Sequence, residues 1–441
     1  MFRRAVSTAW PAVLESFFIS LAGLIDTMMV ASLGSEAVAA VGLTTQPKFL
    51  GMSPFIAVSI AVSALVARRK GEGKRDQANQ VLLAALTVTV ILCAAISVLC
   101  VAFAPPVMTI SGSNADTHVS AVIYFRVIMG GMAFAMISFI INAAQRGSGY
   151  TRIAMTTNVV SSLVNICFNY LLIGGHCGFP RLGVFGAALA TVLGTVVACI
   201  MSIASLFRKN SYVNLPFCIR ERLRPTADIF RSIRGLSVNF LAENLLMRIG
   251  FLATAFIAAR IGTDAFAAHN VGMNVLSLGF SFADGMQAAA VSLSGQALGA
   301  GDKEGAWRYA SICQRIGFGI SVVLAALLIG GGRAFYGLFF DEPHIVEMGV
   351  IISRYEAAAV VLQISQIIFG ACLRAAGDAR YCMIASTVSV TVIRASICFV
   401  LTVLLNMGLH GIWLGILSDQ LSRFLFMWLR FRKGDWVDLK I

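Results

Sequence analysis

Charged residues are scarce in this sequence: Asp, Glu, Lys and Arg together make up 12% of its 441 residues. Ordinary water-soluble domains carry about 25% charged residues, so this chain has too few polar side chains to cover a surface that faces water. The shortage excludes soluble enzymes, secreted scaffolds and disordered proteins. What the chain has instead is 58% hydrophobic residues and 40 glycines.

Motifs that mark metal sites and hydrolytic enzymes are also missing. The five histidines show no metal-ligand spacing, the ten cysteines form no C-x-x-C pair, and neither H-E-x-x-H nor G-x-S-x-G occurs. Glycine-bearing stretches at 69–73 and 298–302 lack the GKS or GKT ending of a phosphate-binding loop and indicate tight cytoplasmic turns. We therefore expect no metal and no cofactor, and the rival class of polytopic membrane enzymes has no evident catalytic residues.

Long apolar runs, separated by short polar or glycine-bearing breaks, fill the chain. A membrane-spanning helix needs about 20 such residues. The runs lie near 9–30, 41–66, 81–103, 121–146, 153–175, 184–207, 233–259, 267–293, 308–330, 346–373, 382–405 and 410–430. We therefore expect an all-α integral membrane protein with twelve transmembrane helices. An even number of spans places both termini on one side of the membrane.

Basic residues are distributed unevenly between the two sets of connections. The set that includes both termini carries 24 Lys and Arg, whereas the other set carries three. Because basic loops stay in the cytoplasm, we expect cytoplasmic termini and a multi-pass location in the plasma (inner) membrane. The same bias accounts for the net charge of +13, so we expect no nucleic-acid partner.

An internal repeat divides the chain at its only long polar stretch. From residue 15 to residue 152 an ungapped offset of 228 aligns many identical residues, and the last helices match at an offset of 225. The matched pairs include Glu15 with Glu243, Gly73 with Gly301, Arg146 with Arg374, Gly149 with Gly377 and Gly183 with Gly408. We expect two parallel six-helix repeats, an N-lobe of residues 1–207 and a C-lobe of residues 233–441, joined by a basic linker at 208–232. Such repeats are typical of transporters.

Acids inside the apolar runs are the first candidate functional residues, because an ionised side chain in lipid is costly. Asp26 lies about two thirds of the way through the first span and predicts a coupling or substrate site, or else a structural hydrogen-bonding acid. Glu15 lies three turns earlier on the same face, about 16 Å away, which fits a proton relay, an inner gate or helix packing. Asn165 and Asn169 share one stripe of the fifth span and predict either a cavity lining or interhelical amide bonds.

The second half carries polar residues that predict a substrate cavity. They are Glu243, Arg248, Asn270, Asn274, Asp284 and Arg394. The two asparagines and Asp284, with Ser277 and Ser281 between them, follow steps of three or four residues, as in a water-lined helix face. Arg248 and Arg394 predict either a buried salt-bridge cluster with Glu243, Asp284 or Asp419, or a site for an anionic or zwitterionic substrate. The other basic residues within spans, such as Lys48 and Arg315, are expected to snorkel or to pair within a lobe.

Several short motifs follow one another along the chain. They are Pro11, Asp26, Met29, Val30, Leu33 and Gly34 in the first span, G-Q-x-L-G-A-G-D at 295–302, Ala267 to His269, the turns at Arg146 and Arg374, and Gly183 with Gly186 to Ala188. Together they resemble the multidrug and toxic compound extrusion (MATE) family. The resemblance implies a V-shaped, two-lobe antiporter that opens alternately to each side and uses proton or sodium flow to expel amphipathic, often cationic small molecules. Its partners would be that substrate and membrane lipid, and we expect a monomer.

Asp26 with Asn165 and Asn169 most resembles the DinF-like branch of that family, where the place typically reads Asn-x-x-x-Asp. Here the second position is Asn169, so one carboxylate is missing. Because sodium prefers charged oxygen ligands, this departure favours protons as the coupling ion, with sodium as the alternative. Two other functions stay open: export of an anionic or zwitterionic metabolite through the C-lobe arginines, and a lipid or oligosaccharide flippase of the same superfamily.

Overall fold

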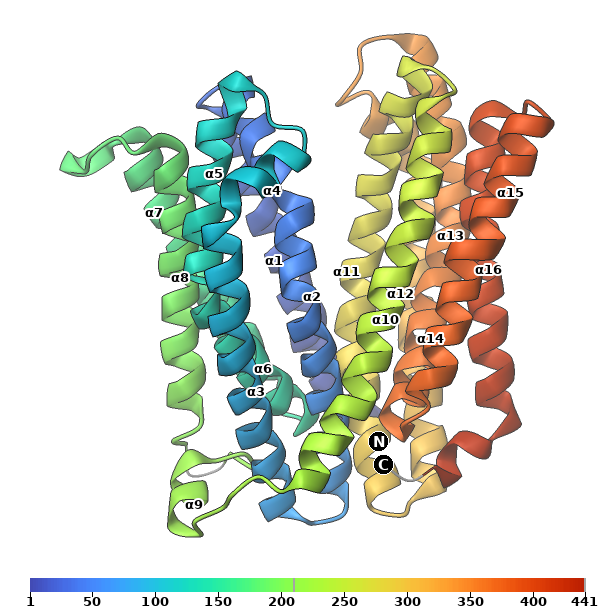
Figure 1. Ribbon diagram of the computed structural model, residues 1–441. Helices are drawn as coiled ribbons and strands as arrows, with labels where there is room; N and C mark the ends of the chain where they lie inside the picture. Colours follow the sequence, from blue (N-terminus) through green and yellow to red (C-terminus); the bar gives the residue numbers. More distant parts are fainter. Residues whose placement is uncertain (209–210, 440–441) are drawn as a thin grey trace. The chain divides into compact units, whose positions relative to one another are not determined.

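The computed structural model describes residues 1–208 and 211–439, which form helices and short connections without any strand (Figure 1). Lipid offers no hydrogen-bond partners, so an apolar chain must satisfy its backbone groups within helices. Nine helices in the described part are long and apolar enough to cross a membrane, or ten if the bent pair α5–α6 counts as one. The long helices α11 and α16 occupy the two remaining expected spans, so the twelve-helix fold is confirmed.

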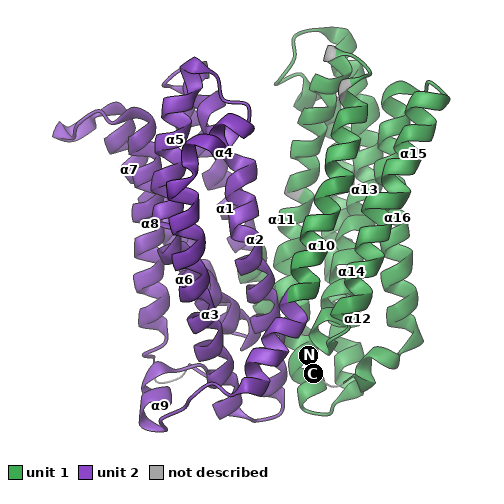
Figure 2. Cartoon of the chain, viewed as in Figure 1, with its two compact units in different colours: residues 1–13, 238–441 green, residues 14–237 purple. Residues whose placement is uncertain are grey.

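The chain forms two compact units (Figure 2): residues 14–237 make unit 2, and residues 1–13 with 238–441 make unit 1. These units differ from the predicted lobes at two places. The linker and residues 233–237 group with the first half. The first thirteen residues belong to the second half rather than to the first. Arg4 Nη2 donates to Gln296 Oε1 at 2.7 Å, and Gly285 leaves room for the backbone of Ala12 and Val13.

Unit 2 contains the first six expected spans and the linker. Its helices are α1 (Phe2–Ala31, from residue 14 on), α2 (Ser35–Gly71), α3 (Arg75–Ala102), α4 (Ala104–Ile110), α5 (Ala115–Gly130), α6 (Met132–Gly147), α7 (Thr151–Gly174), η1 (His176–Gly178), α8 (Gly183–Ser205) and α9 (Leu215–Arg220). The fourth expected span is broken, because α5 and α6 meet at Gly131 with a bend of 46°.

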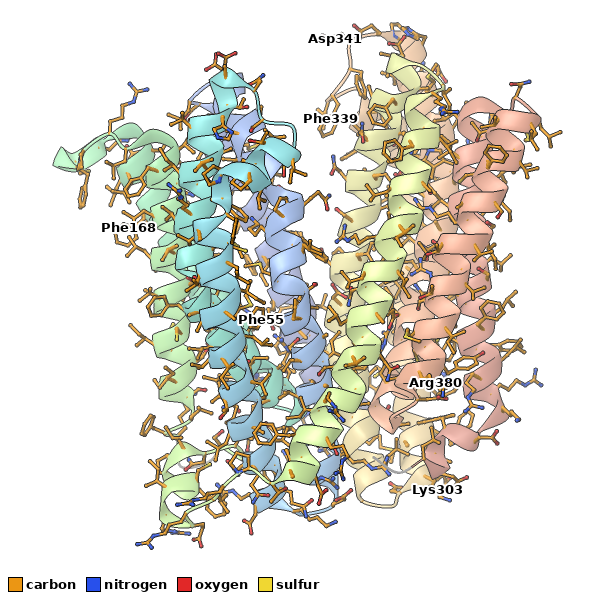
Figure 3. All side chains as sticks on the ribbon, in the orientation of Figure 1. Phe55, Phe168, Lys303, Phe339, Asp341 and Arg380 are labelled. Atoms are coloured by element: carbon orange, nitrogen blue, oxygen red, sulfur yellow. The ribbon has the colours of Figure 1, made fainter. Side chains whose placement is uncertain are left out.

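Unit 1 contains the other six spans. Its helices are α10 (Ala227–Ala259, from residue 238 on), α11 (Thr263–Gly299), α12 (Lys303–Tyr336), α13 (Pro343–Ala376), α14 (Ala379–Thr387), η2 (Val388–Arg394), α15 (Ala395–Phe399), η3 (Val400–Leu404), α16 (Gly408–Lys433) and η4 (Asp435–Asp438). The eleventh span is one continuous rod from α14 to η3 that contains two stretches of π-helix. Lys303 and Asp341 mark the two ends of the unit (Figure 3).

Helix bounds repeat along with the sequence. α2 and α11 start and end at positions that differ by 228 residues. The turns that follow them need glycine, because Gly73 and Gly301 have φ of 73° and 74°, a region that residues with a Cβ avoid. These turns join membrane helices, which agrees with the sequence interpretation of both glycine-bearing stretches. In the first turn, burial raises the pKa of Glu72, but hydrogen bonds from Lys74 and Arg69 outweigh it and lower the pKa below 4.5.

Candidate coupling and substrate sites

The candidate coupling residues of unit 2 come together. Asn169 of α7 is fully buried, and its Nδ2 donates to Asp26 Oδ1 of α1 at 2.5 Å. The same nitrogen lies 3.5 Å from Asn165 Oδ1, and Asn165 Nδ2 donates to Thr191 Oγ1 of α8 at 3.2 Å. The sequence stripe on α7 therefore faces Asp26, as a cavity lining or an amide network requires.

Three further residues belong to this site but were not assigned to it from the sequence. They are Lys48, Tyr124 and Thr191. Lys48 of α2 interacts electrostatically with the Asp26 carboxylate. Tyr124 of α5 is buried, forms a hydrogen bond with Thr191, and interacts electrostatically with Asp26. A lysine within an apolar span is a visible signal, but its sequence position does not tell which helix it faces. The site therefore holds one carboxylate, one nearby ammonium, and several neutral hydrogen-bonding groups.

Glu15 is tied to its own unit by a buried ion pair. Arg146 Nη1 lies 2.7 Å from Glu15 Oε1, and Asn158 Nδ2 donates to the same oxygen at 2.6 Å. The equivalent acid of unit 1, Glu243, pairs with Arg374 at 2.6 Å. Arg374 is the repeat equivalent of Arg146. The two acids thus join helices at matched places, and a proton relay or an inner gate stays a prediction for both.

Arg374 is the hub of the polar cluster around Glu243. Besides that carboxylate it binds Gln287 Oε1 at 3.2 Å and interacts electrostatically with Asp284. Asp284 is itself exposed on α11, as are Asn270 and Asn274. These three side chains are therefore exposed in the structure, and the water-lined face and its role in binding substrate stay predictions.

The two mid-membrane arginines of unit 1 lie in different surroundings. Arg248 is half-buried on α10. Arg394 is 2% exposed, and its Nε donates to Thr254 Oγ1 at 3.0 Å while its Nη1 lies 3.6 Å from Asp419. Asp419 also accepts two hydrogen bonds from Arg423. Arg394 is thus part of a buried salt-bridge cluster and offers no accessible surface to a ligand here.

The two halves use the same position differently. At the offsets of the repeat, Asp26 corresponds to Thr254, and Asn169 corresponds to Arg394. In both units the later residue donates a hydrogen bond to the earlier one. One copy therefore has an acid with an amide donor, whereas the other has a hydroxyl with a guanidinium donor. Only the first arrangement provides a carboxylate that can gain and lose a proton.

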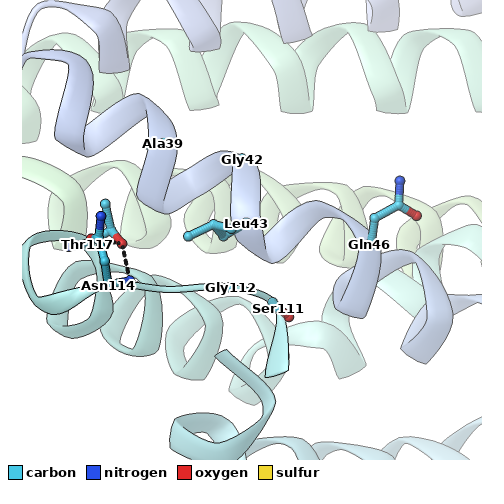
Figure 4. A pocket seen from close by; sticks show the side chains of 8 residues that line it. All are labelled: Ala39, Gly42, Leu43, Gln46, Ser111, Gly112, Asn114 and Thr117. Atoms are coloured by element: carbon cyan, nitrogen blue, oxygen red, sulfur yellow. Dashed lines mark hydrogen bonds between the residues drawn. The ribbon is translucent and has the colours of Figure 1, made fainter. Parts of the chain in front are cut away.

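A hollow of about 670 Å³ lies between α2 and the connection that precedes α5 (Figure 4). Ala39, Gly42, Leu43 and Gln46 of α2 line one side, and the connection from Ser111 to Thr117 lines the other. Asn114 caps α5 by accepting from the Thr117 backbone N–H at 3.0 Å, so this connection is ordered by a helix cap. No candidate site residue lines the hollow.

In the described part of the chain no group of three potential metal ligands gathers, and the ten cysteines are free thiols.

Known proteins that are similar to this chain align over nearly its whole length. "Probable multidrug resistance protein NorM" of Thermotoga maritima is 28% identical and aligns over 98% of this chain and 93% of its own length. "Uncharacterized transporter YisQ" of Bacillus subtilis is 23% identical over 98% and 94% of the two chains. A solved outward-facing multidrug resistance MATE family transporter of the MOP superfamily superposes with a TM-score of 0.90 at 23% identity, covering 99% and 96% of the chains. A crystal structure of MATE in the bent conformation gives 0.89 at 24% identity, covering 98% and 95%.

The family model MatE matches the chain twice, at residues 11–171 and again at residues 240–400, once in each half. This double match supports the internal repeat independently of the helix bounds. The matched relatives with an assigned role are multidrug transporters and not enzymes. Since the two matches together cover most of its length, the chain belongs to the MatE family of multidrug transporters.

Proposed function

We propose that the protein is a proton-coupled antiporter that exports amphipathic small molecules, with both termini in the cytoplasm and the chain acting as a monomer in the inner membrane. The observation that carries the coupling proposal is the contact between Asp26 and Asn169 beside Lys48. Among the described residues of this group Asp26 is the only carboxylate, and no ion pair joins it to an arginine. A carboxylate in such surroundings is suited to change its protonation state.

The charge at this site supports a proton over a sodium ion. Sodium is a hard cation that needs several oxygen ligands, preferably charged ones. Here the single carboxylate already accepts from Asn169 and has the Lys48 ammonium as a resident cation. The positive charge of Lys48 disfavours a sodium ion beside the carboxylate, whereas a proton adds directly to Asp26.

Protonation of Asp26 has a direct consequence for a cationic substrate. With Asp26 ionised, its negative charge offsets that of Lys48, and a cation is tolerated nearby. Once Asp26 is neutral, Lys48 leaves one uncompensated positive charge that repels a cation. Proton entry from outside then favours substrate release to the outside, which is the exchange that an antiporter requires.

The test is transport in proteoliposomes under separately imposed proton and sodium gradients, with ethidium as the probe. For the wild type we expect efflux driven by the proton gradient alone. Asp26→Asn cannot take up the coupling proton and leaves Lys48 uncompensated, so at matched protein levels we expect proton-driven efflux to be lost and ethidium binding to weaken. Wild-type rates in Asp26→Asn would remove this residue from the mechanism, and efflux driven only by sodium would overturn proton coupling.

Export of an anionic or zwitterionic compound is the second candidate function. Its support is electrostatic and does not require contact with the substrate: buried Arg394 and Arg423 share the single carboxylate of Asp419. This leaves one positive charge in excess within the lobe. The same vesicles loaded with an anionic dye of similar size distinguish the two candidates, because a cation exporter should leave that dye inside.

A further inference from the structure

Glu356 of α13 is a buried acid that sequence reasoning overlooked. Its side chain has no exposed surface, and neither carboxylate oxygen has a hydrogen-bond partner among the described residues. The buried acids Glu15, Glu243 and Asp419 each have an arginine within hydrogen-bond distance. Burying an ionised carboxylate without such a partner is far costlier than burying the neutral acid. Glu356 is therefore protonated in the conformation described.

Three other polar side chains from three helices surround this acid. His269 of α11, Tyr336 of α12 and Trp413 of α16 are all buried, and His269 Nδ1, the Tyr336 hydroxyl and Trp413 Nε1 also have no partner among the described residues. The ring centroids of His269 and Trp413 lie 5.6 Å apart. Tyr336 interacts electrostatically with Glu356. One further charge acts on the cluster, because Arg394 of η2 interacts electrostatically with His269.

Gly272 brings these groups into contact. A Cβ at this position of α11 would lie 3.0 Å from Glu356 Oε1 and 2.7 Å from the Trp413 ring. Two turns further along the same helices, a Cβ at Gly279 would lie 2.9 Å from Gln363 Oε1. Gln363 is fully buried, and both ends of its amide lack a partner in the described structure. Polar groups thus continue along α13 from Glu356 toward the end that carries Arg374.

The other half of the repeat fills the equivalent place with apolar side chains. The equivalents of Glu356, His269, Tyr336 and Trp413 are Ile128, Val41, Met108 and Ala188. All four belong to, or pack against, the hydrophobic core of unit 2. The fold therefore does not need polar groups at this place, and packing alone does not explain four of them in unit 1. Unpaired buried polar groups are costly, so a function in unit 1 is the better account.

We infer that Glu356, in the C-terminal half, is a second acid that carries a proton in the transport cycle. Tyr336, Trp413 and His269 are the polar groups that surround its carboxylate when it is ionised. The inference extends the proposed proton antiport. In the step concerned the O–H bond of Glu356 breaks, the proton passes to the aqueous phase, and the electron pair stays on the carboxylate. Hydrogen bonds donated by the Tyr336 hydroxyl and the Trp413 N–H would then stabilise the charge. Two protons, one at Asp26 and one at Glu356, would accompany each transported molecule.

Infrared spectroscopy tests the protonation state without requiring transport. The purified wild type should show a buried carboxylic-acid C=O band at neutral pH that disappears reversibly as the pH is raised. Glu356→Gln should lack this band, and Asp26→Asn, as the matched control, should keep it. An unchanged band in Glu356→Gln, or a band that no pH removes, would overturn the inference. Glu356→Asp should restore a titrating band, and its absence there counts against the inference too.

Transport stoichiometry tests the role in the cycle. The proton gradient that just balances an opposing ethidium gradient gives the number of protons per molecule in proteoliposomes. We expect this number to fall by one in Glu356→Gln at matched folded protein, and an unchanged number would show a structural acid. If the wild type shows no proton-driven efflux, the proposed function fails, while a titrating Glu356 band would still establish the proton site.

Discussion

The charge of Lys48 affects which ion the Asp26 carboxylate can bind. A lone carboxylate in the membrane attracts any available cation, and Lys48 on helix α2 interacts electrostatically with it. The missing second carboxylate at Asn169 and the presence of Lys48 act in the same direction. Both reduce the negative charge available to a sodium ion, and both leave a proton as the simplest exchangeable cation.

Charge changes at these two positions should therefore alter ion selectivity. Asn169→Asp combined with Lys48→Gln leaves two carboxylates and no ammonium, a set of ligands that suits sodium. We expect the double variant to gain sodium-dependent ethidium efflux, and each single variant to show a weaker effect. The measurement is efflux against sodium concentration at fixed pH. Lys48→Arg, which keeps the charge, is the control and should stay insensitive to sodium.

The candidate residues also show what a sequence can predict of a site. The spacing of Asn165 and Asn169 placed them on one face of α7, and the structure brings that face to Asp26. Spacing along one helix says nothing about contacts between helices, so Lys48, Tyr124 and Glu356 were not assigned. For the same reason the partner of Glu243 was sought in Arg248 and Arg394, whereas the structure pairs it with Arg374.

The buried pairs that join helices make a prediction about stability. Arg374→Ala leaves Glu243 as an uncompensated buried charge, which should cost about 3–5 kcal/mol and lower the folded yield and melting temperature. Arg333→Ala is the control, because its pair with Glu347 is 76% and 57% exposed and exposed pairs are worth at most about 1 kcal/mol. Equal melting temperatures for the two variants would contradict the anchoring role. Glu243→Gln added to Arg374→Ala should recover part of the loss.

At the scale of elements, the sequence predicted the twelve helices and the repeated turns, but it did not predict the break between α5 and α6. All twelve apolar runs became helices or helical rods, and the turn glycines stand at equivalent places. The break between α5 and α6 was not expected, because apolar content continues through Gly131. The equivalent helix α13 has Ala359 there and is unbroken. Glycine at 131 permits close contact with α8, since a Cβ would lie 2.7 Å from the side chain of Val192.

Gly131→Ala should therefore destabilise the protein, by about 1–3 kcal/mol for a methyl group forced into a packed interface. The neighbouring Gly130 is the matched control, because a Cβ there meets its nearest neighbour at 3.9 Å and alanine favours helix by up to about 1 kcal/mol. Thermal unfolding in detergent measures both variants. A Gly131→Ala protein as stable as Gly130→Ala would mean that the bend does not depend on this contact.

At the scale of the whole molecule, membrane orientation follows from the distribution of basic residues. The split of 24 to 3 between the two sets of connections predicts that reporters fused after Arg220 and after Lys433 are cytoplasmic, whereas reporters near Asp116 and His344 are external. Native Cys177 offers a check without fusions, because it is exposed in η1 on the predicted external side. A variant that keeps only this cysteine should react with an impermeant maleimide added to intact spheroplasts. An external signal after Arg220 would reverse the orientation and put the Asp26 end of α1 toward the cytoplasm, so the proton gradient would act on the site from the opposite side.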